Sequence, residues 1–542
     1  MEFPHDGESV YYRYQAAYVR SWSGDLLYCT GPGVNRIQGN WDLISVVLDT
    51  QSPTPPTQPY FHHVKLNGDF QGQEFHELRQ ASTSTFTGII LSDVADHANA
   101  KQDFETFFCQ LLLREANFAI THQSTSLNPV SLDRYDQATE EIVSLFDRFL
   151  RYQGENDKWI ESGRAYFAER VRHFTSQGRR IELCLPAFPC KSSNIDKVTG
   201  KDPDRGELLA LERLHSFVEA VEKIYDVGAK LWIISDGHVF SDCIGVDDED
   251  VDLYGLKLIK MNRAIGLRRG NPDRVGFKSL VDLFELDGRY KHKLARLSKL
   301  DIPTIDHHVE TRVTTEAELC RRILMAGCQS QRSGLRARIE SQDAAILALY
   351  RGFSRFMLED LEHHPFTRTM SRSKQKKLSA KVAFEMIMRN QAYSNLVELL
   401  FPNHIRLSIH AHNNAGPKFG IQLFDPAVVR AVESLSPNSN PMTSRDLLHI
   451  PTPWHNSVVK VVGSKVLCVT KAKVVRDALA DGGMTGSLLG QENQIDSIPA
   501  VYYTVCATAT KREAAEQQEE HKEPQKTIPK ITITSNRDSR AS

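Results

Sequence analysis

Residues 183–194 read LCLPAFPCKSSN, and residues 231–242 read LWIISDGHVFSD. Each begins as an apolar run typical of a buried strand and breaks into a polar loop. Between Gly206 and Gly228, apolar residues recur at helical spacing. The order strand, helix, strand predicts a right-handed crossover between two parallel strands. Both loops then leave the sheet at one edge, where ligands bind in open α/β sheets.

The sequence around this unit predicts an α/β fold with a Rossmann-like, mostly parallel sheet flanked by helices. Acidic residues at 248–252 favour a helix start there, because carboxylates stabilise the positive end of the helix dipole. Strand patterns return at residues 405–410 and 419–423. Farther on, Gly463-Ser464 separates two β-branched runs, which predicts an additional C-terminal strand region containing a hairpin.

The chain is predicted to have four parts. Residues 1–130 form an N-terminal extension, partly irregular because residues 50–59 are proline-rich. Residues 131–475 form the main α/β domain, with a helical insert at about 296–400. Residues 476–509 are a C-terminal segment, and residues 510–542 are too charged to pack and are predicted to be a disordered tail.

The composition excludes several classes of protein. In 542 residues, 66 Lys and Arg balance 68 Asp and Glu, so no long-range field favours nucleic acid or an anionic membrane. The nine cysteines form no CxxC pair, which favours reduced thiols over disulfides or zinc. The chain start lacks a signal-peptide pattern, and no apolar run is long enough to span a bilayer. We expect a cytoplasmic protein.

Three further blocks carry a resemblance to a known family: IRLSIHAH at 405–412, KFGIQL at 418–423 and PTPWHN at 451–456. Together with the two loops, they resemble the pyoverdine/dityrosine biosynthesis family of isocyanide synthases, from about residue 135 to about 474. The resemblance implies conversion of an amino acid's amine, commonly that of tyrosine or tryptophan, to an isonitrile with ribulose 5-phosphate as carbon donor. It implies no redox cofactor, and no metal is predicted.

Such substrates require a seat for phosphate, a partner for the amino acid carboxylate and groups that move protons near neutral pH. The loop after the first strand offers phosphate donors in front of a helix start, which itself attracts anions. These are Lys191, Ser192, Ser193, Asn194, Lys197 and Arg205. Lys191 is the main candidate, and a covalent imine on it is a second interpretation. Solvated loop lysines are the structural alternative.

The loop after the second strand carries Asp236, His238 and Asp242, with Gly237 permitting a sharp turn. We predict acid and base roles for them, because two acids at one strand exit are costly unless used or paired. A helix-capping arrangement is the alternative, above all for His238.

Beyond the helical region, Arg406, Ser408 and His410 fall on one face of a strand, and Lys418 enters the next strand. We predict acid/base or carboxylate-binding roles for Arg406 and His410, and an anion site completed by Lys418. His410 and His412 form a His-x-His pair, but no accompanying carboxylate supports a metal site. An ordinary strand-edge lysine remains the alternative for Lys418.

In PTPWHN, prolines stiffen a loop in which Trp454 offers a flat wall for an aromatic amino acid and His455 a protonatable neighbour. Trp454 could instead pack in the core. The predicted catalytic residues are therefore Lys191, Asp236, His238, Asp242, His410 and His455. The predicted substrate-binding residues are Ser192, Ser193, Asn194, Lys197, Arg205, Arg406, Lys418 and Trp454.

The leading functional hypothesis is an isonitrile synthase acting on tyrosine and ribulose 5-phosphate, with no nucleic-acid or membrane partner. Its product would be released or passed to a downstream tailoring enzyme. The dityrosine branch of the family suggests an alternative, an enzyme forming N-formyltyrosine. A third hypothesis, from another class, is a sugar-phosphate-binding protein without turnover.

Overall fold

The computed structural model describes the backbone over most of the chain. The described residues are 10–20, 26–49, 69–70, 73–74, 79–82, 85–91, 134–152, 154–176, 178–283, 305, 307–326, 332–401, 404–410, 412–416, 418–435, 450–490, 494–495 and 498–508. The predicted tail lies outside these residues. Within the N-terminal extension, six strands are described: β1 Val10–Arg20, β2 Leu26–Asp49, β3 Asp69–Phe70, β4 Gln73–Glu74, β5 Arg79–Ser82 and β6 Thr85–Leu91.

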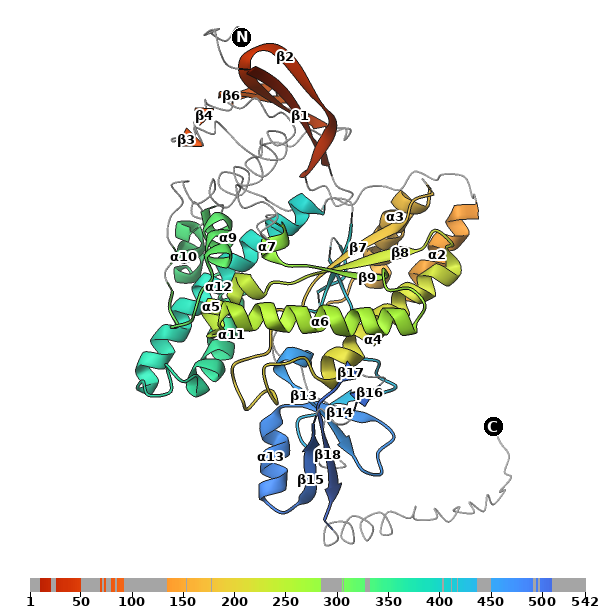
Figure 1. Cartoon of the computed structure of the whole chain (residues 1–542), viewed down its shortest axis with the longest axis vertical. Helices are drawn as coiled ribbons and strands as arrows, with labels where there is room; N and C mark the ends of the chain where they lie inside the picture. Colours follow the sequence, from red (N-terminus) through yellow and green to blue (C-terminus); the bar gives the residue numbers. More distant parts are fainter. Residues whose placement is uncertain are drawn as a thin grey trace, which may run out of the picture.

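A five-stranded parallel sheet lies at the centre of the α/β part, in the order β11-β10-β7-β8-β9 (Figure 1). This confirms the predicted fold class. The strands are β7 Ile181–Pro186, β8 Ala229–Ile234, β9 Val275–Lys278, β10 Ile405–Ser408 and β11 Lys418–Gly420.

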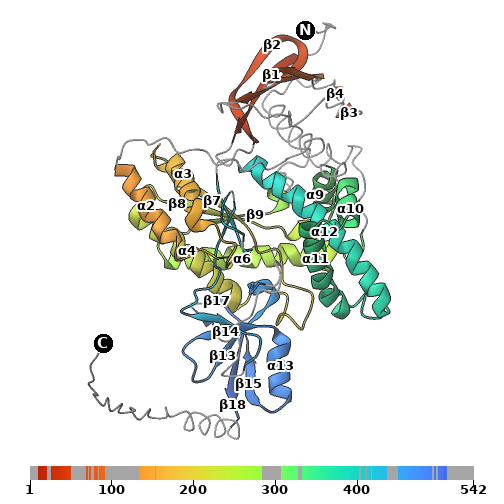
Figure 2. The same ribbon diagram turned by 180° about the vertical axis from the view of Figure 1, so that it is seen from behind.

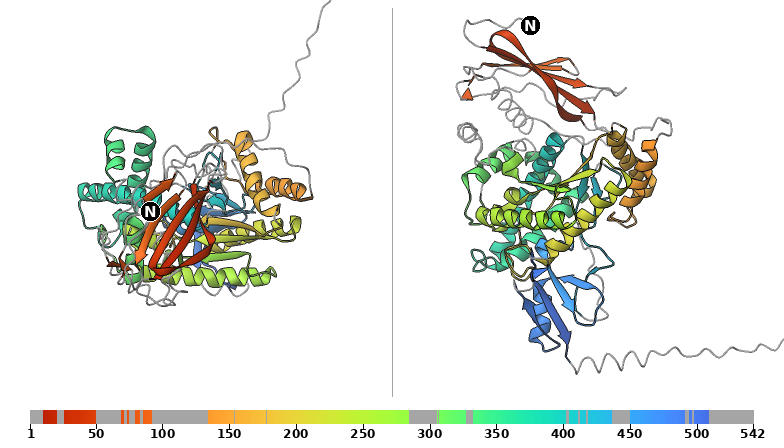
Figure 3. Two further views of the ribbon diagram at one scale, coloured as in Figure 1. Left: turned by 90° about the horizontal axis from the view of Figure 1, so that it is seen from above. Right: turned by 45° about the vertical axis from the view of Figure 1, so that its right-hand side comes forward.

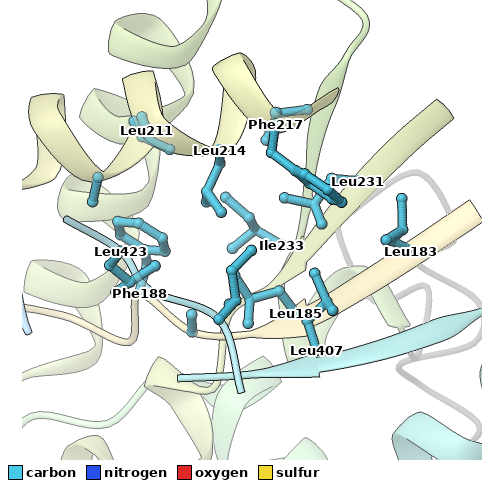
Figure 4. Close-up of a cluster of buried hydrophobic side chains, with 14 of the residues drawn as sticks. Leu183, Leu185, Phe188, Leu211, Leu214, Phe217, Leu231, Ile233, Leu407 and Leu423 are labelled. Carbon is cyan, nitrogen blue, oxygen red and sulfur yellow. The ribbon is translucent and has the colours of Figure 1, made fainter. Parts of the chain in front are cut away.

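The predicted crossover helix is α4, Arg205–Ile224, and it covers one face of the sheet. A capping box starts it: Asp204 accepts from the Gly206 N–H, and Glu207 accepts from the Asp204 N–H. Its apolar face packs against alternate residues of β7 and β8 (Figure 4). Burying each such side chain contributes about 1.5–3 kcal/mol, so this face fixes the register of the sheet. Figure 4 labels Leu211, Leu214 and Phe217 of α4 together with Leu183, Leu185, Leu231 and Ile233 of the sheet in one buried cluster.

Other helices surround this unit. The predicted acidic start at Asp248 is confirmed, and the helix runs on to Arg268 (α6, Asp248–Arg268). Seen from behind, α9 to α12 gather on the side opposite α2 and α3 (Figure 2). The bounds are α2 Arg134–Phe146, α3 Arg164–Thr175 after a π-helical turn at Trp159–Gly163, α5 Gly237–Ile244, α7 Leu280–Leu283, α9 Thr315–Ala326, α10 Arg332–Glu340, α11 Ala344–His363 and α12 Arg372–Leu400.

A second sheet, in the order β12-β14-β13-β18-β15, projects with α13 from the α/β part (Figure 3). The predicted hairpin is its β13–β14 pair. Because β15 and β18 belong to the same sheet, this sheet extends across residue 475. The domain boundary predicted at that residue stays a prediction. The bounds are β12 Val429–Ala431, β13 Ser457–Val461, β14 Leu467–Thr470, α13 Ala472–Ala480, β15 Met484–Leu489 and β18 Tyr502–Ala507, with a separate pair β16 Gln494–Ile495 and β17 Ile498–Pro499.

The segment between β7 and α4, residues 187–204, connects the two sheets, and we call it the strap. Its Ser192 N–H donates to the carbonyl of Trp454 (3.0 Å), just before β13. Farther along, its backbone carbonyls accept from the first turn of α13: the Ala472 N–H donates to Lys197 (3.2 Å) and the Lys473 N–H to Asp196 (2.9 Å). The strap therefore places the second sheet at the carboxyl edge of the first.

Candidate functional site

The carboxyl ends of β7, β8 and β10 bring the strap, Asp236 and the pair His410/His412 to one edge of the sheet. Helix α12 adds Tyr393, whose hydroxyl donates to the carbonyl of Ile234 at the end of β8 (2.9 Å). The turn Pro453–His455 reaches the same edge through the strap. The structure thus brings the five sequence blocks together, while the role of each residue stays a prediction.

Asp236 stands at the amino terminus of α5 and makes no side-chain capping bond there. The residue is half-buried, but its Oδ1 is shielded from solvent and has no hydrogen-bond partner among the described residues. Burial raises the pKa of this carboxyl to about 7. A group with that pKa can both accept and release a proton near neutral pH.

The SDGHVFSD segment was expected to be a loop, and this expectation is wrong: α5 begins at Gly237. Gly237 is required for close packing rather than for a turn. A Cβ there would lie 2.3 Å from the carbonyl oxygen of Pro189 in the strap. His238 therefore lies on a helix, with its Nε2 3.1 Å from Asp252 on α6.

Asp242, six residues after Asp236 on α5, is already paired. Arg389 of α12 donates to both its oxygens (2.5 and 2.9 Å), and His307 Nδ1 lies 3.1 Å from Oδ2. Burial acts to raise the pKa of Asp242, but the charge and hydrogen bonds of Arg389, with His307 and Arg321, outweigh it and hold this pKa well below its usual range. Asp242, which we predicted to be catalytic, is thus a carboxylate bound in an ion pair.

Lys191 is equally enclosed. Its Nζ lies 2.8 Å from Asp204 Oδ2, 2.9 Å from Glu207 Oε2 and 2.8 Å from the carbonyl oxygen of Pro453. The side chain is 1% exposed. Burial acts to lower the pKa of Lys191, but the two carboxylates outweigh it and raise this pKa above its usual value.

The other predicted phosphate donors of the strap also bind protein groups. Lys197 Nζ lies 2.8 Å from Asp360 and over the ring of Phe356. The Ser192 hydroxyl donates to Asp360, Ser193 to the Ile244 carbonyl and Asn194 to the Glu359 carbonyl. Arg205, which is the first residue of α4 and lies just after the strap, stacks over the ring of Tyr502. The strap therefore uses these groups for internal bonding, which differs from the open phosphate seat that we expected.

Two cations instead converge on α12. Arg406 Nη2 and Lys418 Nζ both donate to the hydroxyl of Ser394, at 3.1 and 2.8 Å. The strand β10 ends at Ser408, so His410 and His412 follow it rather than continue it. Both nevertheless use the Ser408 hydroxyl: the His410 N–H donates to it (3.2 Å), and His412 Nε2 lies 2.8 Å away. These side chains form a polar row beside the carboxyl edge, and two of them, Arg406 and Lys418, are cationic.

The turn Pro453–His455 carries two predicted site residues, Trp454 and His455, and their surroundings differ. Trp454 is 2% exposed and packs against Phe188 in the core, the alternative that the sequence left open. His455 is half-buried, packs edge-on against Phe356, and its Nδ1 lies 3.2 Å from the Thr452 hydroxyl. Burial, followed by Lys197 and Lys471, lowers its pKa well below the usual value, so the imidazole is neutral at pH 7.

Sequence reasoning missed several residues at this edge. Arg389, Tyr393 and Ser394 were read only as part of a helix, although a buried arginine among apolar residues is a signal for an ion pair. Glu207 was missed because it looks like an ordinary first-turn acid. Within the described residues, no cluster of three or more His, Cys, Asp or Glu side chains could hold a metal ion. None of the described helices is long and apolar enough to cross a membrane.

Comparison with known proteins agrees with this geometry. Residues 171–482 match the family model of the pyoverdine/dityrosine biosynthesis proteins. The chain is 45% identical over 364 residues to the spore wall maturation protein DIT1 of Saccharomyces cerevisiae, covering 66% of this chain and 67% of DIT1. It is 31% identical over 298 residues to an L-tyrosine isonitrile synthase of Xenorhabdus nematophila, covering 55% of this chain and 73% of that enzyme.

A solved structure shares the fold. The crystal structure of the PvcA protein from Pseudomonas aeruginosa superposes with a TM-score of 0.50 at 25% identity, covering 68% of this chain and 99% of PvcA. The family match, the fold and the converging carboxyl edge lead to one conclusion. The chain belongs to the pyoverdine/dityrosine biosynthesis protein family, which includes isonitrile synthases.

Proposed function

We propose that this chain is an isonitrile synthase that converts the amino group of an L-amino acid, tyrosine first among the candidates, into an isonitrile. Ribulose 5-phosphate supplies the carbon. The observation that carries the proposal is Asp236, an acid with a pKa of about 7 and a shielded oxygen without a partner among the described residues, at the edge where the polar row ends. The similarity to an L-tyrosine isonitrile synthase supports the choice of tyrosine.

The proposed chemistry needs proton transfer more than any other catalytic aid. The amine condenses with the ketone of ribulose 5-phosphate and loses water, which gives an imine at C2. The C1–C2 and C2–C3 bonds then break: one fragment loses its hydroxyl proton and leaves as a carbonyl compound, and the other leaves with its bonding electrons and takes up a proton. The former C2 stays on nitrogen with no net oxidation. Asp236 serves as the acid and base of these steps, because its pKa lies near the operating pH. His455, neutral at pH 7, is a second proton acceptor.

The anionic ends of the substrates require positive charge. Arg406 and Lys418, which already share the hydroxyl of Ser394, are proposed to bind an anionic group, the amino acid carboxylate or the sugar phosphate. This replaces the strap as the proposed anion seat. The strap cations Lys191 and Lys197 are paired with Asp204, Glu207 and Asp360.

The test is direct. Purified full-length chain is incubated with ribulose 5-phosphate and tyrosine, tryptophan or valine, and any isonitrile is trapped with a tetrazine. We expect a trapped product with tyrosine and none when ribulose 5-phosphate is left out. Absence of product with every amino acid, together with calorimetric binding of ribulose 5-phosphate, would instead support a binding protein without turnover.

A second candidate follows from the 45% identity to the spore wall maturation protein DIT1. In this case the released product is N-formyltyrosine, which an isonitrile yields on hydration. The same assay separates the two. Formamide that is present before any exposure to acid supports the formyl product, whereas formamide that appears only after acid treatment supports the isonitrile.

A further inference from the structure

The strap and the turn Pro453–His455 meet at Lys191. We propose that Lys191 is a positioning residue that holds His455 at the carboxyl edge, and that it is neither a nucleophile nor a phosphate ligand. This inference rests on the proposed function, because it assigns His455 a part in that reaction.

The hydrogen bonding of the ammonium group is the first argument. A protonated lysine has three N–H donors, and Lys191 has three acceptors within 2.9 Å: Asp204, Glu207 and the carbonyl oxygen of Pro453. An ammonium held in this way keeps its proton and has no lone pair to attack a ketone. With the side chain 1% exposed, no phosphate can reach it without breaking the cluster.

The position of the cluster is the second argument. Asp204 and Glu207 form the capping box of α4, so they are fixed to the helix under the sheet. Pro453 opens the turn that carries His455 two residues later. Lys191 therefore joins a rigid helix end to the segment of chain that leads from the site into the second sheet.

Close packing makes this joint specific. A Cβ on Gly206, in the first turn of α4, would lie 2.9 Å from Cβ of Pro453, so only a glycine lets the turn lie directly on the helix. The strap binds the same turn a second time through the Ser192 N–H and the Trp454 carbonyl (3.0 Å). The turn is thus held at two consecutive carbonyl groups, those of Pro453 and Trp454, and Lys191 supplies the charged contact.

The cluster also indicates how to remove Lys191 without unfolding the chain. Tyr254 donates to Glu207 Oε1 (3.0 Å), and burial raises the pKa of Glu207 to about 7. Lys191→Met alone would leave two buried carboxylates facing each other. In the double variant Lys191→Met/Glu207→Gln, a neutral amide replaces one of them. Its oxygen can still accept from the Asp204 N–H, and its NH2 group can donate to the Tyr254 hydroxyl oxygen, so that both positions stay hydrogen-bonded.

The experiment compares this double variant with wild type and with Lys223→Met, a matched change on the exposed face of α4. Isonitrile formation is measured across pH. We expect kcat to fall about 10²-fold, as for a misplaced catalytic group, with little change in the KM of either substrate. The low-pH limb of the kcat profile, which His455 contributes, should also be lost. An unchanged kcat in the folded double variant overturns the proposal.

Two further readouts do not depend on turnover. Borohydride reduction in the presence of ribulose 5-phosphate should leave Lys191 unmodified, and a reduced adduct on it overturns the proposal. Acylation of His455 by diethyl pyrocarbonate, followed by peptide mass spectrometry, should be faster in the double variant than in Lys223→Met. If wild type makes no isonitrile, the proposed function fails, but equal acylation rates are still what would reject the positioning role.

Discussion

Asp236 and Asp242 lie six residues apart at the same strand exit, and the structure treats them in opposite ways. Asp242 is bound by two nitrogens of Arg389 and has a pKa well below its usual range. Asp236 keeps a shielded oxygen without a partner among the described residues and has a pKa of about 7. Each carboxyl has an oxygen that is shielded from water, so burial alone does not set the direction of the pKa shift. The Arg389 cation beside Asp242 accounts for the difference.

The largest expected effect comes from the unpaired acid. Asp236→Asn keeps the shape of the side chain but cannot take up a proton, so we expect kcat to fall by about 10²–10⁴-fold. The variant should still fold and should be at least as stable as wild type at pH 7, because the neutral amide avoids the cost of a buried charge. Steady-state kinetics and a thermal melt measure both. The control is Asp202→Asn, at an exposed ion pair with Lys257, and an active Asp236→Asn enzyme would remove Asp236 from the mechanism.

For the paired acid, Asp242, we expect removal of its partner to lower the free energy of unfolding. Arg389→Met leaves Asp242 buried with only His307 and Arg321 nearby, and breaking a buried pair costs about 3–5 kcal/mol. Urea unfolding measures the loss. The control is Arg372→Met, at an exposed pair with Glu362, which should change stability by about 1 kcal/mol or less. Equal stability of the two variants would mean that Asp242 is not an ionic anchor.

The smallest effect is a contrast in pH dependence. The folded chain holds a proton on Asp236 between the unfolded pKa of about 4 and the folded pKa of about 7, so this group lowers stability as pH rises through that window. Asp242 acts oppositely: its stabilisation is present above about pH 4 and is lost as pH falls toward its depressed folded pKa.

Two variants separate these contributions. Asp236→Asn should flatten the decline in unfolding free energy between about pH 4 and pH 7, and Asp242→Asn should flatten the loss below about pH 4. Urea unfolding at a series of pH values measures both slopes. Identical profiles for the two variants would contradict the assignment of opposite pKa shifts.

Local patterns predicted the frame of the molecule. The apolar runs of β7 and β8 and the helical spacing in α4 reflect burial against one another, so residue spacing alone was enough to predict the crossover unit. The hairpin β13–β14 followed from its turn residues in the same way. The sequence also placed the strap, Asp236 and Arg406 near one edge, because parallel strands end together.

What the sequence could not predict depends on partners far along the chain. Arg389 pairs with Asp242 across 147 positions, and no local pattern announces that contact. Gly237 looked like a turn residue, but its role is to let α5 approach Pro189. Trp454 looked like a substrate wall because aromatic residues serve in sites and cores alike, and only packing separates the two.

The strap has a consequence for how the molecule comes apart. Its backbone is bonded on one side to the turn before β13 and on the other to the first turn of α13, while its own ends continue β7 and α4. Neither sheet can therefore melt without releasing the other. Heat should denature the described α/β part and the second sheet in one cooperative transition, and a single proteolytic nick between Ala187 and Asp204 should abolish that cooperativity.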